Sequence, residues 1–174
     1  MSIRRINDVY VANSARVMGN VKLGTNVNLW YGVVIRGDVA PITVGSGTNV
    51  QDNSVIHCEY DRPNSIGANV TIGHGAIVHG DAIGDGSMVG MGAILLGNSV
   101  IGQGCLIAAG AVVSPGMEVP DSMVVMGVPG KIVRPVTEEE QQMLRHIPLQ
   151  YVEGAEAYVA GEEARVQPWD QPVS

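Results

Sequence analysis

Aliphatic side chains recur every six residues over most of the chain, and this period dominates the sequence. The repeat positions are Val11, Val17, Leu23, Leu29, Ile35, Val44, Val50, Ile56, Ile66, Ile72, Val78, Ile83, Val89, Leu95, Ile101, Ile107, Val113, Val119 and Val125. A period of six matches neither the amphipathic helix nor the alternation of an isolated strand. It is typical of a coil in which three short parallel strands form each triangular turn and the aliphatic side chains face a common interior.

This pattern resembles that of the hexapeptide-repeat proteins, whose coil is a left-handed parallel β-helix. The handedness rests on the resemblance alone, because parallel crossovers are in general right-handed. We therefore expect a mainly β protein, with a left-handed parallel β-helix of hexapeptide repeats over residues 1–136 and a C-terminal α-helical segment and tail over residues 137–174.

The C-terminal region begins where the repeats stop, after the segment Gly127-Val128-Pro129-Gly130-Lys131. Thr137 and Glu140 have the spacing of a capping box, which predicts that a helix begins there. Pro148 is expected to break or kink this helix, with a second helical segment over about residues 150–163. Residues 167–174 are predicted to form a loose tail.

The six-residue register breaks three times, always between residues 35 and 83. The step from Ile35 to Val44 is nine residues, the step from Ile56 to Ile66 is ten, and the step from Val78 to Ile83 is five. The ten-residue step contains a polar, proline-containing loop over residues 58–64, which we expect to project from the coil. Irregularities of this kind gather on functional faces of solenoids.

Counting the repeats in threes places two histidines above one another. The repeats that start at Ile35, Ile56 and Val78 share one column, so the residues that follow them, Arg36, His57 and His79, are predicted to stack about 4.8 Å apart. His57 and His79 are 22 positions apart, as expected for one turn of about 18 residues and a short insertion.

His74 belongs to a different column, which it shares with Asp52. Both lie two places after their repeat starts, Ile72 and Val50, and Gln51 precedes Asp52. His74 therefore projects from a different wall and cannot readily meet His57 and His79 in one chain. A neighbour related by three-fold symmetry can bring it opposite them, so the spacing predicts metal sites between subunits of a homotrimer.

Three neutral imidazoles around one ion leave a fourth position open, and in such a site zinc lowers the pKa of its bound water to about 7. Arg36, Asp38, Gln51 and Asp52 are available to hold the ligands. A single histidine on a solenoid wall is usually a solvated surface residue. His146, on the C-terminal helix, is interpreted in that way, whereas the joint placement of the other three favours metal binding.

The sequence is similar to the γ-class carbonic anhydrase family over nearly its whole length. The matching segments are Arg36-Gly37-Asp38, Pro41-Ile42, Val50-Gln51-Asp52-Asn53-Ser54-Val55-Ile56-His57, Ile72-Gly73-His74 and His79-Gly80. The resemblance implies a homotrimer that binds zinc, or another divalent metal such as iron or cobalt, through His57, His74 and His79. It also implies the reversible hydration of carbon dioxide to bicarbonate by metal hydroxide.

The same resemblance assigns catalytic roles to Arg36, Asp38, Gln51 and Asp52, with Gln51 near the attacking water and Arg36 paired to Asp52 of a neighbour. The chain departs from the family where Val39-Ala40 replaces an expected acid after Asp38, and where a longer acidic loop is missing. Glu59 is then either a proton-transfer group or a solvated carboxylate. Tyr151 resembles a family tyrosine that reaches the site.

Two other functions remain open. Hexapeptide acyltransferases that use acyl-CoA share the segments Ala108-Ala109-Gly110-Ala111-Val112-Val113 and Gly127-Val128-Pro129-Gly130-Lys131, so these segments do not discriminate between the two enzyme classes. The missing acids also allow a non-catalytic subunit that binds metal or serves in assembly.

Composition and charge narrow the choice of partners. A net charge of −7 and a pI near 4.9 argue against nucleic acid and against an anionic membrane. No apolar run approaches the ~20 residues of a membrane span, and a cytoplasmic location is expected.

Aromatic residues make up only 4% of the chain, which predicts a narrow interior without rings. Cys105 fits a buried site, and Cys58 is either a metal ligand or a bystander.

Overall fold

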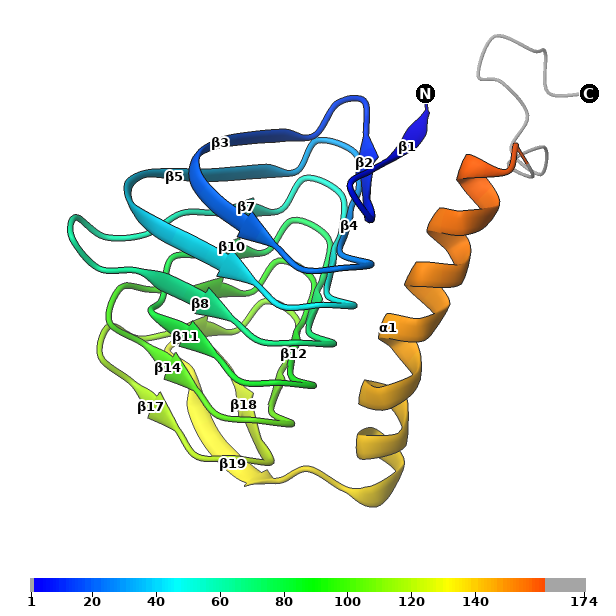
Figure 1. Cartoon of the computed structure of the whole chain (residues 1–174). Helices are drawn as coiled ribbons and strands as arrows, with labels where there is room; N and C mark the ends of the chain where they lie inside the picture. Colours follow the sequence, from blue (N-terminus) through cyan, green and yellow to red (C-terminus); the bar gives the residue numbers. More distant parts are fainter. Residues whose placement is uncertain (1, 162–174) are drawn as a thin grey trace, which may run out of the picture.

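The computed structural model describes residues 2–161, which form a triangular parallel β-solenoid with one helix along its side (Figure 1). We call its three sides walls 1, 2 and 3. Wall 1 contains β2 (Val9–Ala12), β4 (Asn28–Leu29), β6 (Asn49–Val50), β9 (Thr71–Ile72), β12 (Met88–Val89), β15 (Leu106–Ile107) and β18 (Met123–Met126). Two antiparallel strands, β1 (Ile3–Ile6) and β19 (Lys131–Pro135), pair with its first and last members.

The other two walls are joined by two long strands that turn a corner. Wall 2 contains β7 (Val55–Ile56), β10 (Ile77–Val78), β13 (Ile94–Leu95) and β16 (Val112–Val113). Wall 3 contains β8 (Asn64–Ile66), β11 (Ala82–Ile83), β14 (Val100–Ile101) and β17 (Glu118–Val119). The first parts of β3 (Arg16–Leu23) and β5 (Val34–Val44) belong to wall 2, and their last parts belong to wall 3.

The aliphatic repeat positions form the interior, as the period predicts. Ile35, Ile56 and Val78 pair in register on wall 2, and Val50 pairs with Ile72 on wall 1. All five are fully buried, and the main core cluster contains no aromatic residue. Burying an Ile or Val side chain contributes roughly 1.5–3 kcal/mol. Val17 is 41% exposed because no further wall 2 strand covers its turn of the coil.

The corners of the coil are tight turns that require particular backbone conformations. At the corner after β9, the N–H of Ala76 donates to the carbonyl of Gly73 at 3.1 Å, and Gly75 has a φ of +67°. A Cβ at Gly73 would lie 2.7 Å from the backbone nitrogen of Met91 in the next turn of the coil. Gly75 therefore supplies the left-handed conformation and Gly73 permits the close stacking. His74 lies between them and is exposed.

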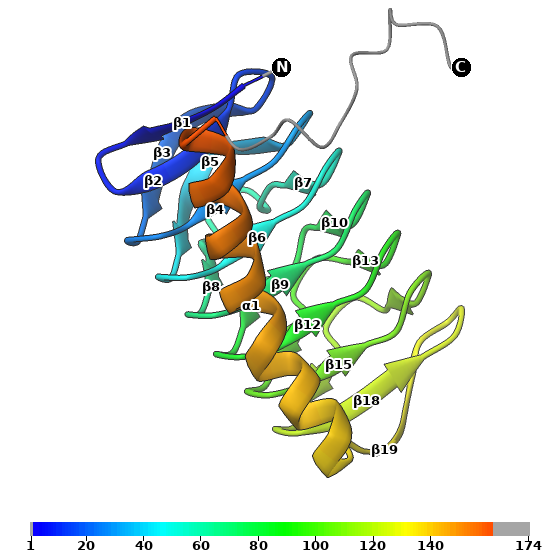
Figure 2. The ribbon, with the colours of Figure 1, turned by 90° about the vertical axis from the view of Figure 1, so that its right-hand side faces the viewer.

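One helix, α1 (Glu138–Val159), runs along wall 1 (Figure 2). The predicted capping box is present, since Thr137 Oγ1 accepts from the N–H of Glu140 and the Glu140 carboxylate accepts from the N–H of Thr137. The prediction of a separate second segment after Pro148 is wrong, because α1 is continuous through that residue. Pro148 is buried against the coil, so packing outweighs the hydrogen bond that proline removes. The tail predicted over residues 167–174 lies outside the described residues.

Five aromatic side chains gather between α1 and wall 1 rather than inside the coil, namely Tyr10, Trp30, Tyr31, Tyr151 and Tyr158, whereas Tyr60 is exposed in the loop over residues 58–64. Trp30 packs edge to face against Tyr151 and Tyr158, with ring centroids 5.4 Å and 5.6 Å apart. The hydroxyl of Tyr10 donates to the carboxylate of Glu156 at 3.0 Å. These contacts fix the lengthwise position of α1 on the wall. Within residues 2–161, no helix is long and apolar enough to span a membrane.

Glu140→Gln is expected to lower the stability of the protein at neutral pH and to have little effect near pH 2. Arg134 and the N–H of Thr137 lower the pKa of Glu140 from 4.5 to about 2. A carboxyl group whose pKa falls on folding stabilises the native state above its unfolded pKa, and this stabilisation disappears as the pH drops from about 4.5 to about 2. Urea unfolding of both proteins across this range measures the difference.

Glu139→Gln is the matched control, because Glu139 lies in the same first turn and makes no ion pair within residues 2–161. It should behave as the parent protein does at every pH. A difference between Glu140→Gln and the parent that is the same at pH 7 and pH 2 would contradict the assignment.

Candidate functional site

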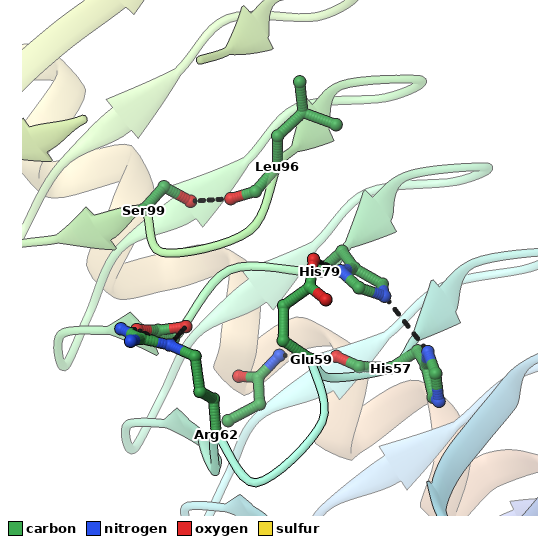
Figure 3. A network of polar contacts seen from close by, with 8 residues as sticks. His57, Glu59, Arg62, His79, Leu96 and Ser99 are labelled. Carbon is green, nitrogen blue, oxygen red and sulfur yellow. Dashed lines mark hydrogen bonds and ion pairs between the residues drawn. The ribbon is translucent and has the colours of Figure 1, made fainter. Parts of the chain in front are cut away.

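His57 and His79 stack at the end of wall 2, as the register predicts. Each follows its strand directly, His57 after β7 and His79 after β10. His57 Nδ1 lies 3.0 Å from His79 Nε2, and the ring centroids are 5.1 Å apart. The two rings are shown side by side in Figure 3. Their side chains are 17% and 29% exposed, so one side of the pair is open.

His74 and Asp52 stack at the corner between wall 1 and wall 2. Both occupy the same place in equivalent turns, which follow β9 and β6 respectively. Asp52 Oδ2 lies 2.9 Å from His74 Nδ1, and Asp52 Oδ1 accepts from the N–H of Tyr31 at 3.2 Å. The carboxylate is therefore held by the backbone and in turn orients the imidazole.

The strand order places these two groups at opposite ends of the wall 2 strands, at two different corners of the coil. The His57–His79 pair directly follows β7 and β10, whereas His74 lies in the turn that precedes β10. Among residues 2–161, no three His, Cys, Asp or Glu side chains form a cluster that could hold a metal ion. One chain therefore does not bring the three predicted ligands together.

Each of these histidines has a carboxylate beside one ring nitrogen. Asp38 Oδ1 lies 3.0 Å from His57 Nε2, and Glu59 Oε1 lies 3.4 Å from His79 Nδ1. Together with the pair of Asp52 and His74, three imidazoles meet three carboxylates. Such a partner fixes the ring and its tautomer and makes the other nitrogen a better ligand. The remaining nitrogens are His57 Nδ1, His79 Nε2 and His74 Nε2.

Arg36 and Asp38 pair with each other within the chain. Arg36 Nη1 donates to Asp38 Oδ2 at 2.5 Å, while the other carboxylate oxygen faces His57. Arg36 first and His57 second lower the pKa of Asp38, so this carboxyl group stays ionised at neutral pH. The side chains of Arg36 and Asp38 are 42% and 45% exposed, so the pair can also meet a neighbouring chain.

Gln51 is almost fully buried, at 4% exposed, and its amide nitrogen donates to Asn49 Oδ1 at 3.0 Å. Asn49 in turn donates to Thr71 Oγ1 at 2.8 Å. The sequence reasoning missed Asn49, although it lies two positions before Gln51, a spacing that puts both side chains on one face of a strand. This buried network holds the Gln51 amide in one orientation.

Three further residues from the sequence analysis have clear places. Cys58 is buried, and its thiol donates to the carbonyl of Ala40 at 3.3 Å, which favours the bystander interpretation. Tyr151 Oη lies 3.5 Å from His74 Nε2, and burial first and the charge of Asp52 second raise its pKa. His146 is exposed on α1, on the surface as expected.

The facing imidazoles suit a divalent metal. Zn–N bonds of about 2.0–2.1 Å in tetrahedral geometry separate two ligand nitrogens by roughly 3.3 Å. The 3.0 Å between His57 Nδ1 and His79 Nε2 is close to this value. Neutral imidazoles with carboxylate partners are also the donor set that zinc and similar ions prefer.

The fold and its repeats define a hexapeptide β-solenoid, and comparison with known proteins agrees. Residues 82–115 match the family described as "Bacterial transferase hexapeptide (six repeats)", and residues 63–96 match "Hexapeptide repeat of succinyl-transferase". A hexapeptide transferase family protein from Anaplasma phagocytophilum has a similar structure, with a TM-score of 0.83 and 38% identity over 88% of this chain and 90% of that chain.

Closer sequence relatives carry a more specific description. A probable carbonic anhydrase of Methanocaldococcus jannaschii is 46% identical over 86% of this chain and 94% of its own length. The mitochondrial gamma carbonic anhydrase 2 of Arabidopsis thaliana is 40% identical over 92% of this chain, which spans 62% of that longer protein. The chain belongs to the γ-class carbonic anhydrase family.

The structure predicts that both cysteines react slowly in the native protein. Burial raises the pKa of the Cys58 thiol and of the Cys105 thiol, and each side chain is at most 1% exposed. Because the thiolate is the reactive form, alkylation by iodoacetamide at pH 8 should be at least about tenfold slower than in urea-unfolded protein. Mass spectrometry of time points measures the rate at each site. Native alkylation of Cys58 at the unfolded rate would contradict its buried placement.

Proposed function

We propose that this protein is a γ-type carbonic anhydrase, a metal-dependent lyase that interconverts carbon dioxide and bicarbonate at sites between the subunits of a homotrimer. The observation that carries the proposal is the facing pair His57 Nδ1 and His79 Nε2, with His74 on the opposite edge of wall 2. The ligand set is then His57 and His79 of one chain and the partner subunit's His74, with zinc or another divalent ion such as iron or cobalt.

The outward side of wall 2 supports assembly through this wall. Its strands present Val34, Val55, Ile77, Ile94 and Val112 to the outside, of which Val55 is 36% and Ile77 is 40% exposed. At the matching positions wall 3 presents Thr43, Ser65, Ala82, Val100 and Glu118. Wall 1 is covered by α1. An apolar surface on wall 2, between the corner that carries His74 and the corner that carries His57 and His79, is what a subunit interface requires.

Each side chain of the site then has a defined task. A divalent ion bound there would supply Lewis acidity, which would lower the pKa of water so that hydroxide is available at neutral pH. Asp38 holds the His57 imidazole and Asp52 holds the His74 imidazole. Gln51, fixed by Asn49, orients a water or the substrate through its amide. Arg36 adds a positive charge for the bicarbonate that forms, and its pairing with Asp38 keeps it beside His57.

Two other functions have support. The similar Anaplasma structure is described as a hexapeptide transferase, and an acyltransferase needs one general-base histidine beside a groove for acyl-CoA. Three imidazoles with three carboxylates exceed that requirement, so the metal enzyme is the better interpretation. A non-catalytic metal-binding subunit would have the same metal ligands but would not accelerate the hydration of carbon dioxide.

Metal analysis with a rate measurement tests the proposal. Protein purified without oxygen should contain about one zinc, iron or cobalt ion per chain, and stopped-flow assays should show carbon dioxide hydration above the buffer rate. Chelation should remove the activity and added metal should restore it. A trimer with no metal that turns over acyl-CoA would establish the transferase, and bound metal without hydration would establish the non-catalytic subunit.

Mixed trimers test the shared site. His57→Ala and His74→Ala homotrimers should each lose metal binding, because every site lacks one ligand. Trimers re-formed from both chains should regain some intact sites, since a His74→Ala chain still supplies His57 and His79 and its neighbour supplies His74. Metal content measured after mixing reports the recovery. Folded mixed trimers that bind no metal would exclude a site built from two chains.

A further inference from the structure

The loop over residues 58–64 brings the carboxylate of Glu59 to the stacked histidines. Glu59 Oε1 lies 3.4 Å from His79 Nδ1, on the ring side opposite the nitrogen that faces His57. Figure 3 shows the Glu59 side chain reaching back from the loop to the His79 ring. Asp38 lies 3.0 Å from His57 Nε2 and Asp52 lies 2.9 Å from His74 Nδ1, so each of the three imidazoles has a carboxylate beside one ring nitrogen.

Several contacts tie this loop to the coil. Arg62 forms an ion pair with Asp81, in which Arg62 Nε lies 3.2 Å from Asp81 Oδ2. The buried amide of Asn64 donates to the carbonyl of His57 at 3.0 Å. The N–H of Arg62 donates to the carbonyl of Glu59 at 3.2 Å and closes a turn. These contacts fix the backbone of the short loop that carries Glu59.

The coil also leaves space for the Glu59 side chain. Gly97 follows β13, in the turn of the coil next to that of His79, and a Cβ added there would meet Glu59 Oε1 at 2.5 Å and Glu59 Cγ at 3.1 Å. The three heavy atoms nearest to the added Cβ all belong to Glu59, so the absence of a side chain at Gly97 leaves room for the Glu59 carboxylate. The Glu59 side chain is 49% exposed, so its carboxylate reaches both solvent and the His79 ring.

We infer that Glu59 is a positioning residue, whose carboxylate holds the His79 ring by accepting from Nδ1–H and so presents Nε2 to the metal. This inference rests on the proposed function, since it names the metal as the group that Nε2 binds. It assigns Glu59 a task different from proton transfer to solvent. Mutation of the carboxylate partner of a metal-bound histidine typically lowers metal affinity about 10–100-fold.

The two roles predict different behaviour of Glu59→Gln and Glu59→Ala. A glutamine oxygen still accepts from Nδ1–H, so Glu59→Gln should keep zinc affinity within about threefold of the parent, whereas Glu59→Ala should lose about 10–100-fold. Gly97→Ala should also weaken zinc binding, because its methyl group displaces the carboxylate. Competition with a zinc chelator measures all three affinities. Asp61→Asn is the control, as Asp61 is an exposed acid in the same loop.

A proton-transfer role predicts the opposite pattern. Both Glu59 variants would then bind zinc as the parent does and would hydrate carbon dioxide equally slowly, with recovery in concentrated imidazole buffer. That result would overturn the inference.

Histidine ring ¹⁵N shifts of the metal-free protein provide a test that does not depend on activity. The parent and Glu59→Gln should show His79 protonated on Nδ1, and Glu59→Ala should not. Parent protein that binds no metal yet shows this tautomer difference would contradict the proposed function and leave the contact of Glu59 with His79 intact. An unchanged tautomer in Glu59→Ala, with metal bound by the parent, would contradict only the role of Glu59.

Discussion

The backbone hydrogen bonds between successive turns of the coil are the constraint on which the rest of the structure depends. The N–H of His57 donates to the carbonyl of Val78 at 3.0 Å, and the N–H of His79 donates to the carbonyl of Leu95 at 2.9 Å. Parallel pairing of this kind holds adjacent strands about 4.8 Å apart. Side chains at equivalent positions must then touch, which brings His57 to His79 and Asp52 to His74 regardless of their distance in sequence.

Because of this constraint, much of the site could be predicted from the sequence. The six-residue period gives the columns, and the columns give the stacking of Arg36, His57 and His79 and the separate placement of His74. The ring-free interior also follows from the composition and agrees with the observed core. The ligand roles of the three histidines and the trimer itself stay predictions, since they depend on chains beyond the one described.

Features that depend on packing outside the coil could not be predicted from the six-residue repeat. Local rules for proline predict a break at Pro148, but the surface of wall 1 holds α1 as one helix. The contact of Glu59 with His79 depends on the loop conformation and on the gap at Gly97, and neither follows from a repeat. The support of Gln51 by Asn49 was missed, although the spacing of two along a strand indicates it.

The antiparallel strands β1 and β19 have a consequence for how molecules meet end to end. A parallel coil exposes unpaired strand edges at both ends, and a second copy could add turns to it without limit, as in a fibre. On wall 1 these edges are occupied by strands that run the other way and sit where the next turn would pair. An incoming coil could continue at most two of its three walls, so the ends of wall 1 oppose polymerisation, while the outer faces of walls 2 and 3 stay uncovered within residues 2–161 and can form closed assemblies.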